Sequence, residues 1–253
     1  MIRLAFPDNP VYKPLFEGSE KYCLGNEVRC YRLSETQCSD YMLRNLVDAA
    51  FLSPLGYGKG VKVADYRIIP GPMMVSENYT GLATIYFKQG LENVNTIYSP
   101  TPDDFMMLLG QLVLNEKFGI DAKIKKMMGS KSDILLNYDS AIIWGKAESG
   151  DISLDVSEEW FDLVEEPLPL GFWVCRAESY PPKIQDIVSS FASAQLAKTE
   201  EILDSSSKYS ERKGKIYWHW EPELEGAFES VLLFLYLHQM LSELPAVKIL
   251  ARD

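Results

Sequence analysis

Short apolar segments alternate with helix-forming segments along this chain, and that order constrains the fold more than any other feature. Apolar runs of strand length occur at residues 2–6, 28–33, 49–52, 140–144 and 171–175. Helical patterns occur at residues 34–47, 101–118, 158–163, 182–203 and 222–241. Strands that alternate with helices predict an α/β protein with a largely parallel sheet, whose loops gather where the strands end.

Two strand patterns, near residues 83–88 and 171–176, bracket a central block of the chain. They predict two lobes. The outer lobe takes residues 1–87 and 173–253, the inserted middle lobe takes residues 88–172, and a cleft lies between them.

The charge balance excludes one class of partner. The chain carries 25 basic and 36 acidic residues, a formal net charge of −11. So acidic a protein repels a phosphate backbone, which argues against nucleic acid as a partner and leaves small molecules. The first 14 residues show no secretory signal, and the most apolar run, residues 231–241, is too short to span a bilayer. We therefore expect a cytoplasmic protein with no membrane partner.

The cysteines and histidines predict no special chemistry. Cys23, Cys30, Cys38 and Cys175 lack CxxC spacing, so free thiols are expected rather than disulfides. His219 and His238 have no partner at ligand spacing, which argues against a metal site. We interpret the Trp-His-Trp run at 218–220 as part of the packing of a lobe, and not as an acid or base group.

Three local patterns predict turns or a helix start. The glycine-rich stretch 56–60 lacks the spacing of a phosphate-binding loop and predicts a flexible turn. The Ile-Pro-Gly-Pro run at 69–72 predicts a break. Thr101 followed by Pro102 and two aspartates predicts a helix capped by Thr101 that ends at Gly119.

Three consecutive segments together resemble the chorismate dehydratase family of menaquinone biosynthesis. They are residues 138–147 (YDSAIIWGKA), 154–163 (LDVSEEWFDL) and 166–176 (EPLPLGFWVCR). Weaker similarities extend over most of the chain, at Asn9 with Pro14-Leu15, and at residues 47–53, 108–120 and 225–228.

The resemblance implies a two-lobed fold like that of the type II periplasmic binding proteins. It also implies a lyase that eliminates water from chorismate to give 3-enolpyruvylbenzoate, with no metal or organic cofactor. In the family's proposed mechanism a substrate carboxylate assists proton removal, so the protein chiefly holds two carboxylates and positions the ring.

The candidate site residues follow from the family positions and from where the predicted strands end. Asn9 and Ser53 are the expected catalytic contacts, although both types also cap turns and helices. The expected substrate contacts are Ser76, Asn78, Thr80, Ser99, Thr101 and Arg176. Trp144 and Trp173 fit either a pocket lining or the core.

The sequence departs from the family where arginines are expected. Residues 76–81 (SENYTG) and 99–104 (SPTPDD) lack them, and Asp103 and Asp104 place negative charge at a predicted helix start. Two alternatives therefore stay open. One is a binding protein of the same fold without catalysis. The other is a related enzyme that acts on a later futalosine-derived intermediate.

Overall fold

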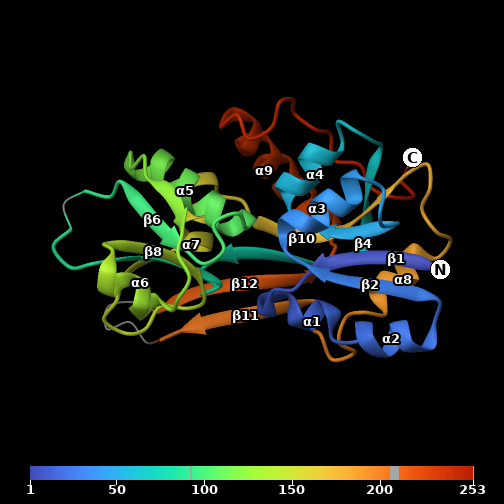
Figure 1. Cartoon of the computed structure of the whole chain (residues 1–253), viewed down its shortest axis with the longest axis horizontal. Coiled ribbons are helices and arrows are strands. Elements are labelled where there is room, and N and C mark those ends of the chain that lie inside the picture. The colour runs from blue at the N-terminus through green and yellow to red at the C-terminus, as the bar shows by residue number, and fades with distance from the viewer. Residues whose placement is uncertain (92, 206–210, 253) are drawn as a thin grey trace. The chain divides into compact units, whose positions relative to one another are not determined.

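The computed structural model describes residues 1–91, 93–205 and 211–252, and it divides the chain into two compact units (Figure 1). The first unit comprises residues 1–75, 169–200 and 217–253, and the second comprises residues 76–168 and 201–216. The sequence had put the boundaries at 87/88 and 172/173 and had left 201–216 in the outer lobe. Residue 92 of the predicted middle lobe, and residues 206–210 and 253 of the predicted outer lobe, lie outside the described residues.

The first unit begins with strands that alternate with helices, as the sequence predicted. Its elements are β1 (Ile2–Pro7), η1 (Pro10–Tyr12), α1 (Lys13–Phe16), α2 (Ser19–Gly25), β2 (Val28–Leu33), α3 (Glu35–Leu43), β3 (Ala49–Leu52), α4 (Pro54–Gly60), α8 (Ile184–Ser189), η2 (Pro222–Leu224) and α9 (Glu225–Leu237). In Figure 1, α3 and α4 cover one face of the β1 to β3 strands, and α1 and α2 cover the other.

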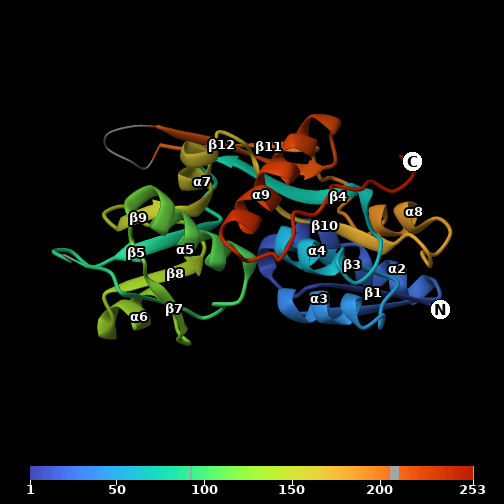
Figure 2. The ribbon, with the colours of Figure 1, turned by 90° about the horizontal axis from the view of Figure 1, so that it is seen from above.

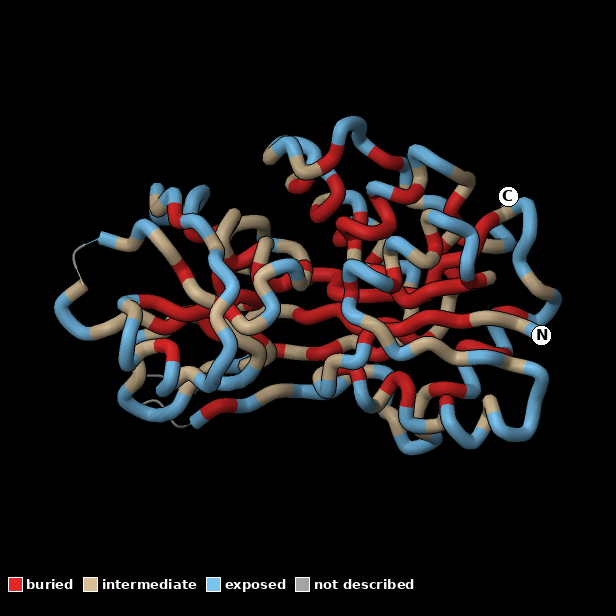
Figure 3. Tube along the Cα trace, viewed as in Figure 1, coloured by how far each residue is buried: buried red, intermediate tan, exposed pale blue. Residues whose placement is uncertain are grey.

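A seven-stranded sheet has the order β11-β12-β4-β10-β3-β1-β2. Strand β1 pairs in parallel with β2 and with β3, whereas β10 (Leu168–Arg176) is antiparallel to β3. The unit boundaries fall within or at the ends of β4 (Tyr66–Asn78), β10, β11 (Thr199–Asp204) and β12 (Arg212–His219). All residues of β3 and β10 are buried, and Figure 3 shows buried positions concentrated along the strands.

The second unit contains a five-stranded sheet of order β7-β6-β8-β5-β9. Its elements are β5 (Ala83–Phe87), β6 (Thr96–Ser99), α5 (Phe105–Phe118), β7 (Lys123–Lys126), α6 (Lys131–Asn137), β8 (Ser140–Trp144), β9 (Ile152–Asp155) and α7 (Val156–Val164). Helices α5 and α7 pack on each other, while α6 covers a small core that contains Tyr86, Ile134 and Ala141. Figure 2 shows the same elements from above. The predicted α/β class is confirmed in both units.

The glycine-rich stretch 56–60 is a helix, α4, and not the flexible turn that the sequence predicted. Its glycines allow close packing, because a Cβ at Gly58 would lie 2.7 Å from Leu241, and one at Gly60 would lie 1.8 Å from the Tyr66 ring. Glycine is therefore required here for contact between elements, at the expense of helix propensity.

The predicted break at residues 69–72 is also wrong, since β4 runs through it as a strand of 13 residues. A residue that precedes proline is pushed toward the extended region, so two prolines in this run are compatible with a strand.

The predicted helix 182–203 is much shorter in the structure, because α8 covers only Ile184–Ser189 and strand β11 begins at Thr199. The predicted apolar face is correct, since Ile184, Ile187, Val188 and Phe191 are buried. Hydroxyl groups of Ser189 and Ser190 donate to the carbonyl oxygens of Gln185 and Asp186, an interaction that competes with helix propagation.

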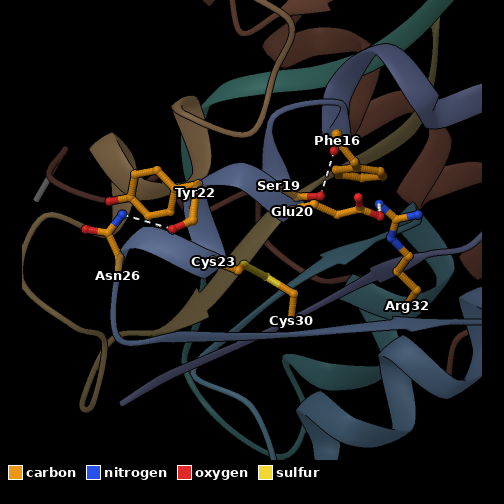
Figure 4. The surroundings of a disulfide bond; sticks show 8 residues. All are labelled: Phe16, Ser19, Glu20, Tyr22, Cys23, Asn26, Cys30 and Arg32. Carbon is orange, nitrogen blue, oxygen red and sulfur yellow. Dashed lines mark hydrogen bonds and ion pairs between the residues drawn. A yellow bond between two sulfur atoms is a disulfide. The ribbon is translucent and has the colours of Figure 1, made fainter.

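The prediction of four free thiols is wrong for one pair. Cys23 and Cys30 form a disulfide, while Cys38 and Cys175 are free and buried (Figure 4). Spacing alone could not reveal the pair, because it depends on α2 lying against β2. Within the described part of the chain, no helix has the length and apolar character needed to cross a membrane.

Candidate ligand-binding site

Three helix N-termini lie at one edge of the sheet in the first unit, where β2, β1 and β3 end. Each is capped by a side-chain oxygen that accepts a hydrogen bond from a backbone N–H two or three residues later. The acceptors are Ser34 for Gln37 (3.2 Å), Asn9 for Val11 (3.1 Å) and Ser53 for Gly56 (3.3 Å). Because parallel strands end at the same edge, the structure brings the two predicted residues Asn9 and Ser53 to neighbouring strand ends.

A cavity of about 380 Å³ opens beside Asn9, entirely within the first unit. Its volume is within the usual range for a small-molecule site. Its apolar part includes Phe6 and Phe16, whose rings stack with centroids 4.3 Å apart. Both rings belong to an aromatic cluster with Phe51, Trp173 and Phe191. A rigid aromatic cluster therefore backs the cavity, with Phe6 1% and Phe16 5% exposed.

Charged groups of both signs line this cavity. The cations are Lys13 and Arg32, and the carboxylates are Asp8, Glu17 and Glu20. The Arg32 guanidinium lies 5.8 Å from the centre of the Phe6 ring and pairs with Glu20 at 3.0 Å. Arg32 is thus the cation best placed to meet an anionic group above the aromatic surface, with Glu20 as its present partner.

Asn9 adds neutral donors to the same cavity. Its Oδ1 atom is occupied by the Val11 N–H, which leaves the two N–H bonds of Nδ2 for a ligand. Sequence reasoning found Asn9 but missed Lys13, Arg32 and the two phenylalanines. Arg32 is the next-to-last residue of β2, which pairs with β1, the strand before Asn9. Only the fold reveals this pairing.

Ser76 and Thr80 belong to the second unit, where they form a buried chain of hydroxyl groups. Thr80 donates to Ser157 at 3.0 Å, and Ser157 donates to Ser76 at 3.0 Å. Ser157 is fully buried and Ser76 is 1% exposed. These hydroxyl groups are already paired, so they hold β4 to the start of α7.

The other predicted residues of the second unit lie at two strand ends and in the turn before α5. Asn78 ends β4 with a φ of +58°. Ser99 is buried at the end of β6, where its hydroxyl accepts from the Thr101 N–H at 3.2 Å. Thr101 is exposed and is not the helix cap that the sequence predicted, because α5 begins at Phe105 and Asp104 occupies the N-cap position.

Arg176 lies at the opposite edge of the first unit's sheet from Asn9 and Ser53. The antiparallel pairing of β10 with β3 places Cys175 beside Ala49, at the start of β3. The Arg176 guanidinium donates to the carbonyl oxygens of Met42 and Leu43 at the end of α3. The structure therefore does not bring Arg176 together with Asn9.

Asp155 is a second feature that the sequence did not indicate. Burial raises the pKa of this carboxyl to about 7, although N–H groups of Glu158 and Gly81 donate to it at 3.0 and 2.8 Å and act in the opposite direction. It caps α7 and joins that helix to the turn before β5. Among the described residues, no group of three or more histidine, cysteine or acidic side chains could hold a metal ion.

Comparisons with known proteins agree with this fold and assign the family. The family model for menaquinone biosynthesis matches residues 3–225. No curated protein matches the chain in sequence.

Two solved structures share the fold. AF1704 from Archaeoglobus fulgidus is 13% identical, covers 95% of this chain and 98% of its own, and has a TM-score of 0.59. XAC2383 from Xanthomonas citri, solved bound to ATP, is 10% identical, covers 96% and 99%, and has a TM-score of 0.52. Both structures share the α/β fold of this chain, the class that the sequence predicted. Because the family match runs through nearly the whole sequence, the chain belongs to the menaquinone biosynthesis family.

Proposed function

We propose that this protein is a chorismate dehydratase-like lyase, which eliminates water from chorismate to give 3-enolpyruvylbenzoate. The observation that carries the proposal is the Asn9 cavity, where an aromatic surface, a free amide and two cations lie together at the strand ends. Membership of the menaquinone biosynthesis family supports a role in that pathway. We also propose the cytoplasm as its compartment and a small carboxylate as its partner.

The residues of the cavity suit the demands of this elimination. A ring C–H proton and the neighbouring hydroxyl group leave together as water, and the ring becomes aromatic. Phe6 and Phe16 would support the ring face, and Arg32 or Lys13 would hold a carboxylate. The Asn9 Nδ2 group would donate to a substrate oxygen and fix the position of the leaving hydroxyl. A substrate carboxylate would assist proton removal.

One observation favours a second candidate, a protein of the same fold that binds a small polar ligand without catalysis. The cavity lining has three carboxylates, those of Asp8, Glu17 and Glu20, against the two cations Lys13 and Arg32. A dicarboxylate would meet net negative charge there unless Glu20 leaves Arg32. A ligand with a positively charged or neutral group would not meet that penalty.

The test is to incubate the purified protein with chorismate and follow the product by chromatography. Three variants accompany it, Asn9→Ala, Arg32→Ala and Arg29→Ala. Arg29 is the matched control, because it lies on the same strand, is exposed and contacts a single ring, that of Tyr31, at 5.1 Å.

For a dehydratase we expect 3-enolpyruvylbenzoate from the wild type and from Arg29→Ala. Asn9→Ala should lower kcat/KM about 100-fold, as loss of a well-placed donor does. Arg32→Ala should raise KM about tenfold through the lost charge-assisted hydrogen bond. Chorismate binding by calorimetry without product would support the binding protein. Absence of both binding and product would exclude chorismate as the ligand.

A further inference from the structure

We propose that the Cys23–Cys30 disulfide is a reversible redox switch on the Asn9 cavity, and that its reduction frees Arg32 for an anionic ligand. The bond joins α2 to β2, and the Glu20–Arg32 ion pair joins the same two elements (Figure 4). Glu20 and Arg32 both line the cavity. The inference rests on the proposed function only for the identity of the ligand.

Helix α2 has little packing of its own to hold it in place. All seven of its residues are described, and Ser19 is the only buried one. Leu24, in its last turn, is 90% exposed. A helix without a buried apolar face gains little from tertiary packing, and a helix this short is marginal in isolation. In its second half, the Tyr22 ring lies edge-on to Phe191 at 5.8 Å, and the disulfide is the covalent restraint.

The first end of α2 is anchored independently of the disulfide. The Gly18 N–H donates to the Phe191 carbonyl oxygen at 2.8 Å. A Cβ at Gly18 would lie 2.7 Å from the Ser190 carbonyl oxygen, so the backbones are in close contact. The Ser19 hydroxyl donates to the Phe16 carbonyl oxygen at 2.6 Å. Release of the disulfide would thus let α2 turn about residues 18–19, and this turn is what we infer would move the Glu20 side chain relative to Arg32.

The ion pair cannot replace the disulfide as a restraint. The side chains of Glu20 and Arg32 are 76% and 45% exposed, and exposed ion pairs contribute little to stability. With the disulfide intact, Glu20 is held beside Arg32 and forms an ion pair with its guanidinium. With α2 released, Arg32 can exchange Glu20 for a ligand carboxylate. The disulfide form is accordingly the low-affinity form of the cavity.

The switch is confined to one pair of cysteines. Cys23 and Cys30 are half-buried, and β2 is the edge strand of its sheet, so a small thiol can reach the bond. Cys38 and Cys175 are buried, and burial raises the pKa of both thiols, which keeps them protonated and unreactive.

The exchange is a two-electron reaction with a low-molecular-weight thiol, the class of reductant found in the cytoplasm. Thiolate attack on one sulfur breaks the Cys23–Cys30 bond and forms a mixed disulfide. A second thiol resolves it, which leaves two protein thiols and one small-molecule disulfide. The two protons come from the two reductant thiols, and oxidation by a small-molecule disulfide reverses the reaction.

The test compares the full chain in its oxidised and reduced forms. Thiol mapping by mass spectrometry verifies the two states, and hydrogen exchange is followed in residues 19–25 and 9–16. Chorismate affinity is measured by calorimetry. Two variants accompany the wild type. Cys23→Ser with Cys30→Ser mimics the reduced form, and Glu20→Gln removes the competing carboxylate while leaving the disulfide intact.

We expect reduction to speed exchange in residues 19–25 and to tighten chorismate binding about fivefold. The double serine variant should match reduced wild type and ignore reductant, and oxidised Glu20→Gln should bind like reduced wild type. If neither form binds chorismate while reduction still speeds exchange in residues 19–25, the redox-dependent movement of α2 is supported and chorismate is excluded as the ligand. Unchanged exchange, a bond that never forms, or unchanged or weaker binding on reduction would overturn the switch.

Discussion

The carboxylate of Asp104 accepts a hydrogen bond of 2.8 Å from the indole N–H of Trp144. Burial raises the pKa of this carboxyl, while the hydrogen bonds from Trp144 and Thr101 oppose that rise. Asp104 precedes α5 without capping it through its side chain. The Asp104 carboxylate therefore joins the start of α5 to the end of β8, within the second unit, through its hydrogen bond with Trp144.

Replacement of Trp144 by phenylalanine should remove this hydrogen bond and raise the pKa of Asp104 further. We expect the free energy of unfolding near neutral pH to fall by about 1.5–3 kcal/mol, the usual worth of a hydrogen bond to a charged group. Urea denaturation measures the loss. The cost should be smaller at a pH below the raised folded-state pKa of Asp104, where that carboxyl is protonated and no longer accepts as a charged group. An equal cost at both pH values would mean that packing, rather than the Asp104 interaction, explains the effect.

Asp155 should make stability fall as the pH rises from about 4 to 7. Burial raises its folded-state pKa from the ordinary value of 3.8 to about 7, so the folded protein holds this proton more tightly than the unfolded chain. Its stabilising contribution is complete below the unfolded pKa and is lost as the pH rises through the folded value. Asp155→Asn should remove this slope from urea denaturation measured across that range.

Asp133 serves as a control, because its pKa is shifted in the opposite direction to that of Asp155. Hydrogen bonds from Ser130 lower the pKa of this exposed carboxyl, so its contribution is lost as the pH falls. Asp133→Asn should leave the slope between pH 4 and 7 unchanged. A wild-type stability that stays flat through this window would contradict the assignment to Asp155.

Local chemistry explains which parts of the fold the sequence could predict. Ser34 and Gly119 mark a helix start and a helix end, and both positions are confirmed. The ends of β1 and β3, which lie just before Asn9 and Ser53, follow from proline and cap residues nearby. The Gly56–60 stretch could not be assigned, because only Leu241 and Tyr66, far away in sequence, show that these glycines pack a helix.

The residues of the candidate site also differ in how far the sequence could predict them. Asn9 was predictable because a turn residue after a buried strand marks the sheet edge where loops gather. Arg32 was not, because β2 alone does not reveal which of its residues turn toward Phe6 and the cavity. Arg176 was assigned to the substrate because it ends a strand. The antiparallel direction of β10 carries it to the other edge.

Arg176 should act on stability and leave ligand affinity unchanged. Its guanidinium donates to the Met42 and Leu43 carbonyl oxygens in the last turn of α3, where the Met42 oxygen also accepts from the Asn45 N–H at 3.2 Å. Arg176→Met keeps the apolar stem and should cost about 3 kcal/mol, because buried acceptors lose charged donors. Thermal unfolding and chorismate calorimetry on the folded protein measure the two effects. Weaker chorismate binding by folded Arg176→Met would restore its predicted substrate role.

Gly214 should be the least replaceable glycine of the second unit. A Cβ there would lie 1.9 Å from the carbonyl oxygen of Tyr79 and 2.6 Å from that of Glu77, and both atoms belong to the backbone. The same region holds the Tyr79 hydroxyl, which donates to Asp204 at 2.8 Å, and the Arg212 guanidinium, 4.1 Å from the Tyr79 ring. An alanine must therefore separate β12 from the end of β4 and disturb these contacts.

We expect Gly214→Ala to lower the free energy of unfolding by about 3 kcal/mol, the upper part of the range for overpacked sites. Gly226→Ala is the matched control, because a Cβ at Gly226 meets nothing within 4 Å and alanine favours the helix in which it lies. Denaturant unfolding of both variants compares them directly. Equal stability of the two would show that β12 does not approach Tyr79 as closely as the structure places it.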